Sequence, residues 1–288
     1  MSVLRVVGLQ LSVRRPWLGV VLAAGLVANS VPAFAGVSYR VTPIASGFSA
    51  TDINDAGWVA GITHWISVQR ASLWSPDSGL QDLGQLYGSA TNSMALSVNN
   101  GNRVVGMEFS QLTHAPRYDL RSGDQAFQWS HDAGMQYLMP ENPAGSIAAA
   151  INDQNQIAGT ANLGGRSLAI RTSPDGDQRF LGTLTGGSDY GGWTGFSVAV
   201  DINADGDVVG ASQAVDGGNH AFLWTEVEGM QDIGYLPGPY RTSFANGIND
   251  ARQVVGWSQG NDCRCAFLET VHDQSHVVDW ADEKELPQ

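Results

Sequence analysis

Positive charge is scarce in this 288-residue sequence. Lys and Arg number 15 against 28 Asp and Glu, so the formal net charge is −13, and Lys284 is its one lysine. A strongly acidic chain offers few cations to replace the counterions of a nucleic acid or an anionic lipid. The composition therefore disfavours nucleic-acid binding, while the 43% apolar content is ample for a packed core.

Cysteine is also rare, with Cys263 and Cys265 in the stretch "DCRCAF". In a secreted protein the two could pair, but positions i and i+2 of a strand lie at the long end of disulfide geometry. A disulfide at a local bend and two free thiols both remain open. Neither alternative makes a metal site, because no second Cys or His pair stands at ligand spacing.

Helical periodicity and familiar catalytic motifs are missing too. After residue 36, no apolar stripe at helical spacing runs for ten residues. The chain contains no G-x-S-x-G nucleophile elbow, P-loop or H-E-x-x-H zinc motif. The sequence therefore points away from a helical fold and from these enzyme classes.

The N-terminus has the pattern of a cleaved secretory signal. Arg5, Arg14 and Arg15 precede the short apolar segment "WLGVVLAAGLV", and Ala33 and Ala35 supply an A-x-A cleavage pattern. Residues 1–35 are therefore predicted to be removed, which makes the net charge more negative by three. The alternative is a retained membrane anchor. Arg14-Arg15 resembles a twin-arginine signal only loosely. We expect a periplasmic or extracellular protein with no membrane insertion after cleavage.

One short phrase recurs five times along the rest of the chain. Its columns hold Ala four residues before an Asn, Val or Ile five residues after it, and Gly seven residues after it. A second phrase, such as "HAFLWTEVEGMQDIG", follows most copies. Together they form a unit of about fifty residues, the size of a propeller blade. The repeats are centred on Asn54, Asn99, Asn152, Asn203 and Asn249.

Each repeat is predicted to contain four short strands, A to D. The segments are rich in β-branched and aromatic residues, and turn residues separate them every eight to twelve positions. The Asn side chain suits a turn between strands A and B, whose fourth residue should be left-handed. The later Gly, inside strand B, indicates close approach of another backbone near a crowded central axis. Trp74, Trp129 and Trp224 recur in strand C and are predicted to lie in the core between repeats.

These features predict an all-β, five-bladed β-propeller over residues 36–288, forming a single domain and a monomer. A strand from "SYRVTPI" (38–44) or "SHVVDW" (275–280) would complete a blade made from both chain ends and close the ring. An open β-solenoid is the competing architecture.

The columns resemble the HAF-repeat family of bacterial extracellular proteins. The resemblance rests on His220-Ala221-Phe222 within "HAFLWTEVEGMQDIG", together with "SVAVDINADGDVVGASQ", and extends over residues 44–269. The His column is Arg70, Gln125, Leu168 and Cys265 in the other copies. The resemblance implies secretion and a repeat fold, but it implies no established activity.

Strand parity sorts the connections between two ends of the predicted sheets. The A–B and C–D turns lie at one end, and the longer B–C and D–A loops lie at the other. These loops carry aromatic and charged residues that suit a binding surface for sugar rings or for a protein. The predicted binding residues are Trp65, His114, Arg117, Tyr118, Asp189, Tyr190, Trp193, Tyr240 and Arg241.

A calcium site is a weaker possibility. The stretch "DINADG" matches the first half of a calcium-binding loop, with Asp201, Asn203 and Asp205 as candidate ligands, but the bidentate acid is missing at Ser212. The sequence otherwise predicts no cofactor.

Two functions remain open at this stage. The first is a secreted, non-catalytic repeat protein that binds a glycan or a cell-surface protein through the loop end. The second is a secreted carbohydrate-active enzyme, a glycosidase or polysaccharide lyase, built on the same scaffold. The catalytic residues of such an enzyme are unknown from the sequence.

Overall fold

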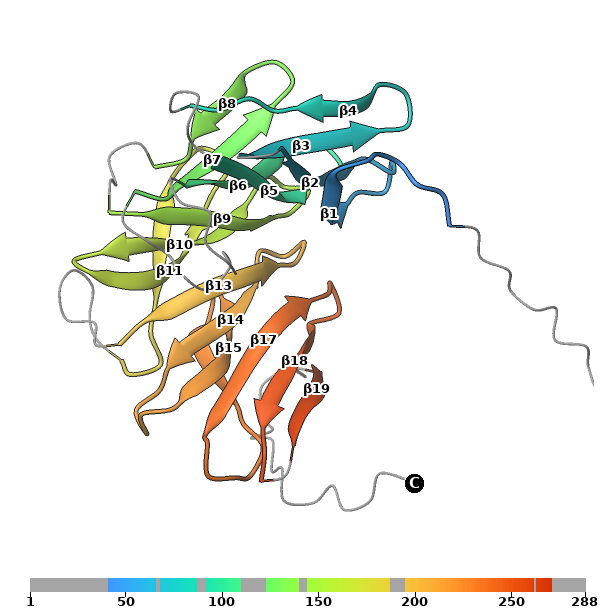
Figure 1. Ribbon diagram of the computed structural model, residues 1–288. Helices are drawn as coiled ribbons and strands as arrows, with labels where there is room; N and C mark the ends of the chain where they lie inside the picture. The colour runs from blue at the N-terminus through green and yellow to red at the C-terminus, as the bar shows by residue number, and fades with distance from the viewer. Residues whose placement is uncertain are drawn as a thin grey trace, which may run out of the picture. The chain divides into compact units, whose positions relative to one another are not determined.

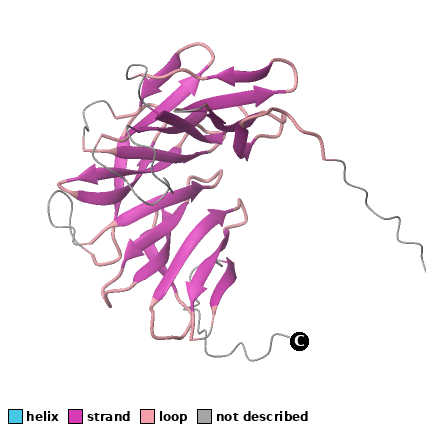
Figure 2. Cartoon of the chain, viewed as in Figure 1, coloured by secondary structure: helices cyan, strands magenta, loops and turns pink. Residues whose placement is uncertain are grey.

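The computed structural model describes residues 41–65, 68–86, 92–109, 123–139, 144–186, 195–261 and 263–270. The chain divides into two compact units, Met1–Thr42 and Pro43–Gln288, and every described strand belongs to the second. The described residues form strands and connections without a helix, as Figure 2 shows. In this part of the chain, no helix is long and apolar enough to cross a membrane. The signal-sequence prediction for residues 1–35 lies outside the described residues.

Within the described residues, nineteen strands follow one another as repeated antiparallel sheets (Figure 1). Repeats 1 to 4 each form a sheet whose four strands pair in chain order, and repeat 5 has three described strands. A single parallel bridge, Asn219 to Thr242, joins repeats 4 and 5. The strands are β1 (Phe48–Ile53), β2 (Val59–His64), β3 (Gln69–Ser75) and β4 (Gly79–Asp82); β5 (Asn92–Val98), β6 (Val104–Phe109), β7 (Gln125–Ser130) and β8 (Gly134–Tyr137); β9 (Ser146–Ile151), β10 (Ile157–Leu163), β11 (Arg166–Thr172) and β12 (Gln178–Gly182); β13 (Ser197–Ile202), β14 (Val208–Gln213), β15 (Asn219–Thr225) and β16 (Gly229–Gly234); and β17 (Thr242–Ile248), β18 (Gln253–Gln259) and β19 (Arg264–Thr270).

The fold class is therefore all-β, with propeller-like four-stranded units. One expected strand differs from the structure: Val41–Ile44, the described part of "SYRVTPI", is not in a strand. Val41 is 93% exposed, and Pro43 has no N–H group to donate to a sheet. The other proposed closing strand, 275–280, lies outside the described residues.

The turn after the first strand of each repeat has the predicted left-handed residue in all five copies. Its φ angle is +78° at Gly57, +58° at Asn102, +61° at Asn155, +81° at Gly206 and +55° at Arg252. Of the residues at this position in the five repeats, Arg252 is the one least suited to a left-handed conformation. Its Nε donates to the Asp207 carboxylate of the preceding repeat at 2.7 Å, which helps to hold it there.

The glycine of each second strand is required by its neighbour within the same sheet. A β-bulge interrupts the first strand of every repeat, for example between Ala95 and Ser97. A Cβ added at Gly106 would lie 2.0 Å from the Met94 carbonyl oxygen and 2.9 Å from the Phe127 ring. The predicted close backbone approach is confirmed, but the crowding comes from the adjacent strand rather than from a central axis.

The core lies between successive repeats. Trp129 of repeat 2 packs with Ala71 and Leu73 of repeat 1, and Trp224 of repeat 4 packs with Ala169 of repeat 3. The prediction of a core role is confirmed for these two tryptophans. Trp74 is only half-buried, because each tryptophan faces the preceding repeat and repeat 1 has none before it in the chain.

Candidate functional site

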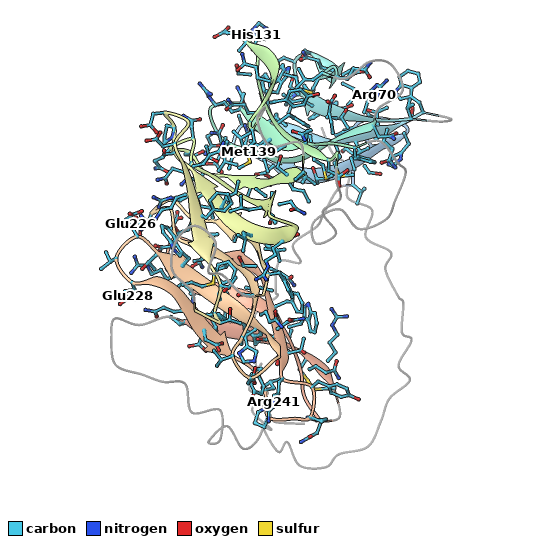
Figure 3. The ribbon with its side chains drawn as sticks, turned by 90° about the vertical axis from the view of Figure 1, so that its left-hand side faces the viewer. Arg70, His131, Met139, Glu226, Glu228 and Arg241 are labelled. Atoms are coloured by element: carbon cyan, nitrogen blue, oxygen red, sulfur yellow. A yellow bond between two sulfur atoms is a disulfide. The ribbon has the colours of Figure 1, made fainter. Side chains whose placement is uncertain are left out.

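Each sheet has two ends, which we name by their connections. The turn end carries the turns that follow β1, β5, β9, β13 and β17, and the loop end carries the connections at the opposite ends of these strands. In Figure 3, Glu226 and Glu228 lie on the β15–β16 hairpin at the turn end, while Arg241 lies at the loop end. The strand register therefore separates the two candidate surfaces as strand parity predicts.

At the turn end, the repeated Asn has two roles. Its side-chain oxygen accepts from the backbone of its own turn, as at Asn99, where the Arg103 N–H donates at 3.0 Å. Its Nδ2 donates to the backbone carbonyl of the same Asn in the next repeat, as from Asn99 to Asn152 at 3.0 Å. The sequence predicted the first role but not the second. The second is repeated from Asn54 to Asn99 at 2.9 Å, from Asn152 to Asn203 at 2.9 Å and from Asn203 to Asn249 at 3.4 Å. We call this chain of bonds the Asn relay.

The residue after each Asn forms further bonds between repeats. The Asn100 N–H donates to Asp153 at 2.8 Å, and the Ala204 N–H donates to Asp250 at 2.9 Å. The Asn100 side chain also donates to Asp55 and to Asp153, at 2.8 and 2.9 Å. At the turn end, hydrogen bonds thus connect neighbouring repeats through side chains that are not required to form the turns themselves.

A cavity of about 260 Å³ opens at the turn end, and residues from all five turns line it. Aliphatic residues at the ends of the first strands line it together with the first four relay asparagines. Asp55, Asp153 and Asp250 also line it. The sequence pattern did not predict a cavity at this end.

Two of the three calcium candidates, Asp201 and Asn203, already have structural bonds, and Asn203 lines this cavity. The Asp201 carboxylate accepts from the Ile202 and Ile248 N–H groups, both at 2.9 Å. The Asn203 oxygen accepts from the Asp207 N–H at 2.9 Å. Across the described residues, no group of three or more His, Cys, Asp or Glu is placed to hold a metal ion. These bonds explain Asp201 and Asn203 as parts of the turn and of the contact between repeats.

Three of the nine predicted binding residues are described, and all three lie at the loop end. Trp65 follows β2 and is 63% exposed, and Tyr240 precedes β17 and is 60% exposed. Arg241 has a φ of +42°, and its guanidinium lies 3.7 Å from the Asp216 carboxylate. The other six lie outside the described residues: His114, Arg117, Tyr118, Asp189, Tyr190 and Trp193.

A buried histidine at the loop end was not predicted as a site residue. His220, the first residue of the His-Ala-Phe triplet, is 4% exposed. Its Nδ1 lies 2.6 Å from Asp232, its Nε2 lies 3.3 Å from Asp216, and its ring centroid lies 4.5 Å from that of Tyr235. The signal in the sequence was the alignment of "HAF" with the "DIG" that follows it, which places His220 and Asp232 on paired strands.

Burial disfavours the charged form of His220, but the carboxylates outweigh it. The hydrogen bond and charge of Asp232, together with the charge of Asp216, raise the pKa of His220 above its ordinary value. Burial acts to raise the pKa of Asp216. The Gly218 N–H and the charges of His220 and Arg241 prevail, however, and lower it. The group therefore favours an imidazolium between two carboxylates.

The cysteine pair at the loop end is oxidised. Cys263 and Cys265 form a disulfide with a Cα–Cα distance of 5.4 Å. The Gly260 N–H donates to the Cys263 carbonyl at 2.8 Å. The disulfide thus links the connection before β19 to the start of that strand. This arrangement decides between the two alternatives that the sequence left open.

No protein-family model matches the chain, and no curated protein matches it significantly. Solved structures similar to it include TolB from Acinetobacter baumannii, with 11% identity and a TM-score of 0.48 over 77% of this chain and 53% of that one. A nidogen/laminin complex has 8% identity and a TM-score of 0.43 over 74% and 73%. A streptogramin B lyase has 12% identity and a TM-score of 0.29 over 80% and 96%. The chain thus spans about half of TolB, and likeness at this level transfers neither a partner nor a reaction.

The described sheets and their two ends define the class of protein. The chain is an all-β repeat protein of antiparallel, propeller-like units, whose turn end is laterally hydrogen-bonded and whose loop end carries exposed aromatic side chains.

Proposed function

We propose that this chain is a secreted, non-catalytic repeat protein that binds an extracellular glycan through its loop end. The observation that carries the proposal is the placement of exposed aromatic rings. Among the large hydrophobic side chains that are exposed in the described part, Trp65 and Tyr240 are the aromatic ones, and both lie at the loop end. Exposed rings on a rigid scaffold suit stacking against the apolar faces of sugars.

The scaffold beneath these rings supports such a role. The Asn relay and the cores between repeats fix each sheet against the next, so the loop end rests on a rigid base. A preformed surface loses less conformational entropy on binding than a mobile one. Arg241, beside Tyr240, adds a hydrogen-bond donor that could reach a sugar hydroxyl or an acidic sugar.

A glycan array probed with residues 36–288 tests the proposal. We expect binding that weakens about tenfold on Trp65→Ala or Tyr240→Ala, a loss typical of one aromatic contact. Ala56→Ser and Ala204→Ser, which lie at the turn end, are the matched controls and should bind as the parent does. A reducing-sugar assay on the bound glycans separates binding from the carbohydrate-active enzyme considered above.

Each result has a definite meaning. Binding that is lost equally in the turn-end controls would contradict the assignment to the loop end. An array without hits, together with capture of a purified cell-surface protein that depends on Trp65, would favour a protein partner instead. Release of reducing ends would favour the enzyme.

We also propose that the five repeats form five blades of a closed ring. One support is the cavity lined by all five turns. The other is the exposed apolar side chains on the two terminal repeats, repeat 5 and repeat 1. Leu268 and Val255 of repeat 5 are 62% and 47% exposed, although Leu223 and Val209, their counterparts in repeat 4, are buried at 2% and 0%. On repeat 1, Ile53 is 64% exposed, whereas Val98 in the same column is 4% exposed.

Closure would pack these two apolar faces together. If it occurs, Leu268→Ala should destabilise the chain by about 2 kcal/mol or more, as expected for a buried Leu, and Leu223→Ala should do the same. Val227→Ala, at a position that is 90% exposed, is the control. Urea unfolding that shows no cost for Leu268→Ala would argue against the closed ring.

Secretion is part of the same proposal, on the strength of the N-terminal pattern. N-terminal sequencing of the protein recovered from the periplasm or the medium should begin at Gly36. Recovery of an uncleaved chain in the membrane fraction would favour the retained anchor.

A further inference from the structure

His220 lies where two connections of the loop end meet. One is the β14–β15 connection, which contains Asp216 and Gly218, and the other is the β16–β17 connection, which contains Tyr235 and Tyr240. His220 lies at the start of β15, directly after the first of these connections. A Cβ added at Gly218 would lie 2.1 Å from the Arg241 carbonyl oxygen and 3.0 Å from His220 Nε2. The two connections are therefore in direct backbone contact beside the histidine ring.

Both ring nitrogens of His220 face carboxylates. Nδ1 lies 2.6 Å from an Asp232 oxygen, and Nε2 lies 3.3 Å from an Asp216 oxygen. A neutral imidazole has one nitrogen that can only accept, and here that nitrogen would face a carboxylate oxygen, which also only accepts. The geometry thus favours the protonated ring, whose Nδ1–H donates to Asp232 and whose charge forms an ion pair with Asp216, although Nε2 itself has no hydrogen-bond partner among the described residues.

Each of the two carboxylates also accepts a hydrogen bond from a nearby backbone N–H group. The Asp216 carboxylate accepts from the Gly218 N–H at 2.9 Å and lies 3.7 Å from the Arg241 guanidinium. The Asp232 carboxylate accepts from the Gly234 N–H at 2.7 Å. The charged and titratable groups that face His220 are thus Asp216 from the β14–β15 connection, Asp232 from β16, and Tyr235 and Arg241 from the β16–β17 connection. We call these four residues, together with His220, the His220 clamp.

The clamp reaches the proposed binding surface through Arg241. This residue is next to Tyr240 in sequence, and its positive φ of +42° is an unfavourable conformation that surrounding contacts must maintain. Those contacts include the Asp216 carboxylate and the Gly218 backbone. Loss of the positive charge on His220 would leave two carboxylates beside a neutral ring and weaken the attachment of both connections.

We propose that the His220 clamp is a pH-responsive device that orders the β16–β17 connection and so regulates binding at the loop end. The inference rests on the proposed function for its biological effect, but the ordering itself can be measured without a ligand. Because the pKa of His220 is raised in the folded chain, the clamp stabilises fully below the unfolded value of about 6.5. It weakens as pH rises through the folded-state pKa.

The test uses residues 36–288 and two measurements that need no glycan. NMR titration of the His220 ring should give a pKa above about 6.5, and Asp232→Asn should lower it.

Hydrogen exchange corrected for intrinsic rate should show the amides of residues 235–242 losing protection by about tenfold once His220 is deprotonated. His220→Gln should abolish this pH dependence, since Gln occupies the same column in repeat 2 at Gln125. His131→Gln, at a side chain that is 86% exposed, is the matched control.

The outcomes separate the clamp from the proposed function. A His220 pKa at or below about 6.5, or protection of residues 235–242 that does not change with pH, overturns the clamp. If the clamp behaves as expected, the glycans bound in the array are tested again at pH 5.5 and pH 8.5. We expect binding at the higher pH to weaken about threefold or more in the parent and to be unchanged in His220→Gln. An array without hits would contradict the glycan proposal and leave the exchange result to decide the clamp.

Discussion

The Asn relay makes a quantitative prediction at Asn99, which is 3% exposed. The variant Asn99→Ala loses the Oδ1 bond to the Arg103 N–H at 3.0 Å, and the Nδ2 bonds to the Asn152 carbonyl at 3.0 Å and to Asn155 Oδ1 at 2.9 Å. Each such bond contributes about 1 kcal/mol net. The Asn152 carbonyl keeps a second donor, the Asn155 N–H at 3.0 Å, so the penalty for an unsatisfied group is partial. We therefore expect the free energy of unfolding to fall by about 2–3 kcal/mol.

Urea unfolding followed by tryptophan fluorescence measures this change as a lower midpoint at an unchanged slope. Asn162→Ala is the matched control, because its Oδ1 accepts from the Gly165 N–H in an exposed turn, and it should cost about 1 kcal/mol or less. Asn99→Asp separates the two roles of the side chain. It keeps the acceptor for the turn but replaces the Nδ2 donor with an oxygen that faces the Asn152 carbonyl. If Asn99→Asp is as stable as the parent, the bond between repeats contributes nothing and the reasoning fails.

The two glycine positions of the repeat give further predictions. Gly106→Ala should cost about 3 kcal/mol or more in urea unfolding, because its Cβ would meet the Met94 carbonyl oxygen at 2.0 Å. Gly101→Ala is its control, and equal stability of the two variants would contradict the packing argument. Gly57→Val should lower the unfolding free energy by about 1–2 kcal/mol through strain at a φ of +78°. Coinciding thermal melts of this variant and of Ala56→Val would show that the left-handed turn is not strained by a side chain.

The local structure of the repeat could be predicted because it depends on neighbouring residues. Asn-x-x-Gly and Asn-x-x-Asn have the chemistry of a tight turn wherever they occur, and the recurring Gly inside a strand needs a close neighbour. Arg252 shows the limit of that reasoning. Its type argues against the left-handed region, yet it adopts a φ of +55° beside Asp207 of the preceding repeat. A contact between repeats therefore overrides the local preference.

The candidate site was harder to predict from the sequence, because it also depends on contacts between repeats. The lateral role of Asn99 depends on how far apart two turns lie, and no pattern along the chain gives that distance. The cavity at the turn end also arises only when five separate turns converge. Trp74 has the same sequence context as Trp224, but it is half-buried, because repeat 1 has no repeat before it in the chain.

The Asn relay also bears on how such a chain could grow. In the relay from Asn54 to Asn249, each inner asparagine donates to the repeat that follows through its side chain and accepts from the one before through its backbone carbonyl. A gene duplication that inserted another copy would find matching partners on either side without any compensating mutation. Repeat number could therefore change in one genetic step, whereas replacement of one of these asparagines by Ala would remove the acceptor of its own turn and the bond to the next repeat together. Selection would then act on the loops of each copy separately, while the shared turn is kept as a common connector.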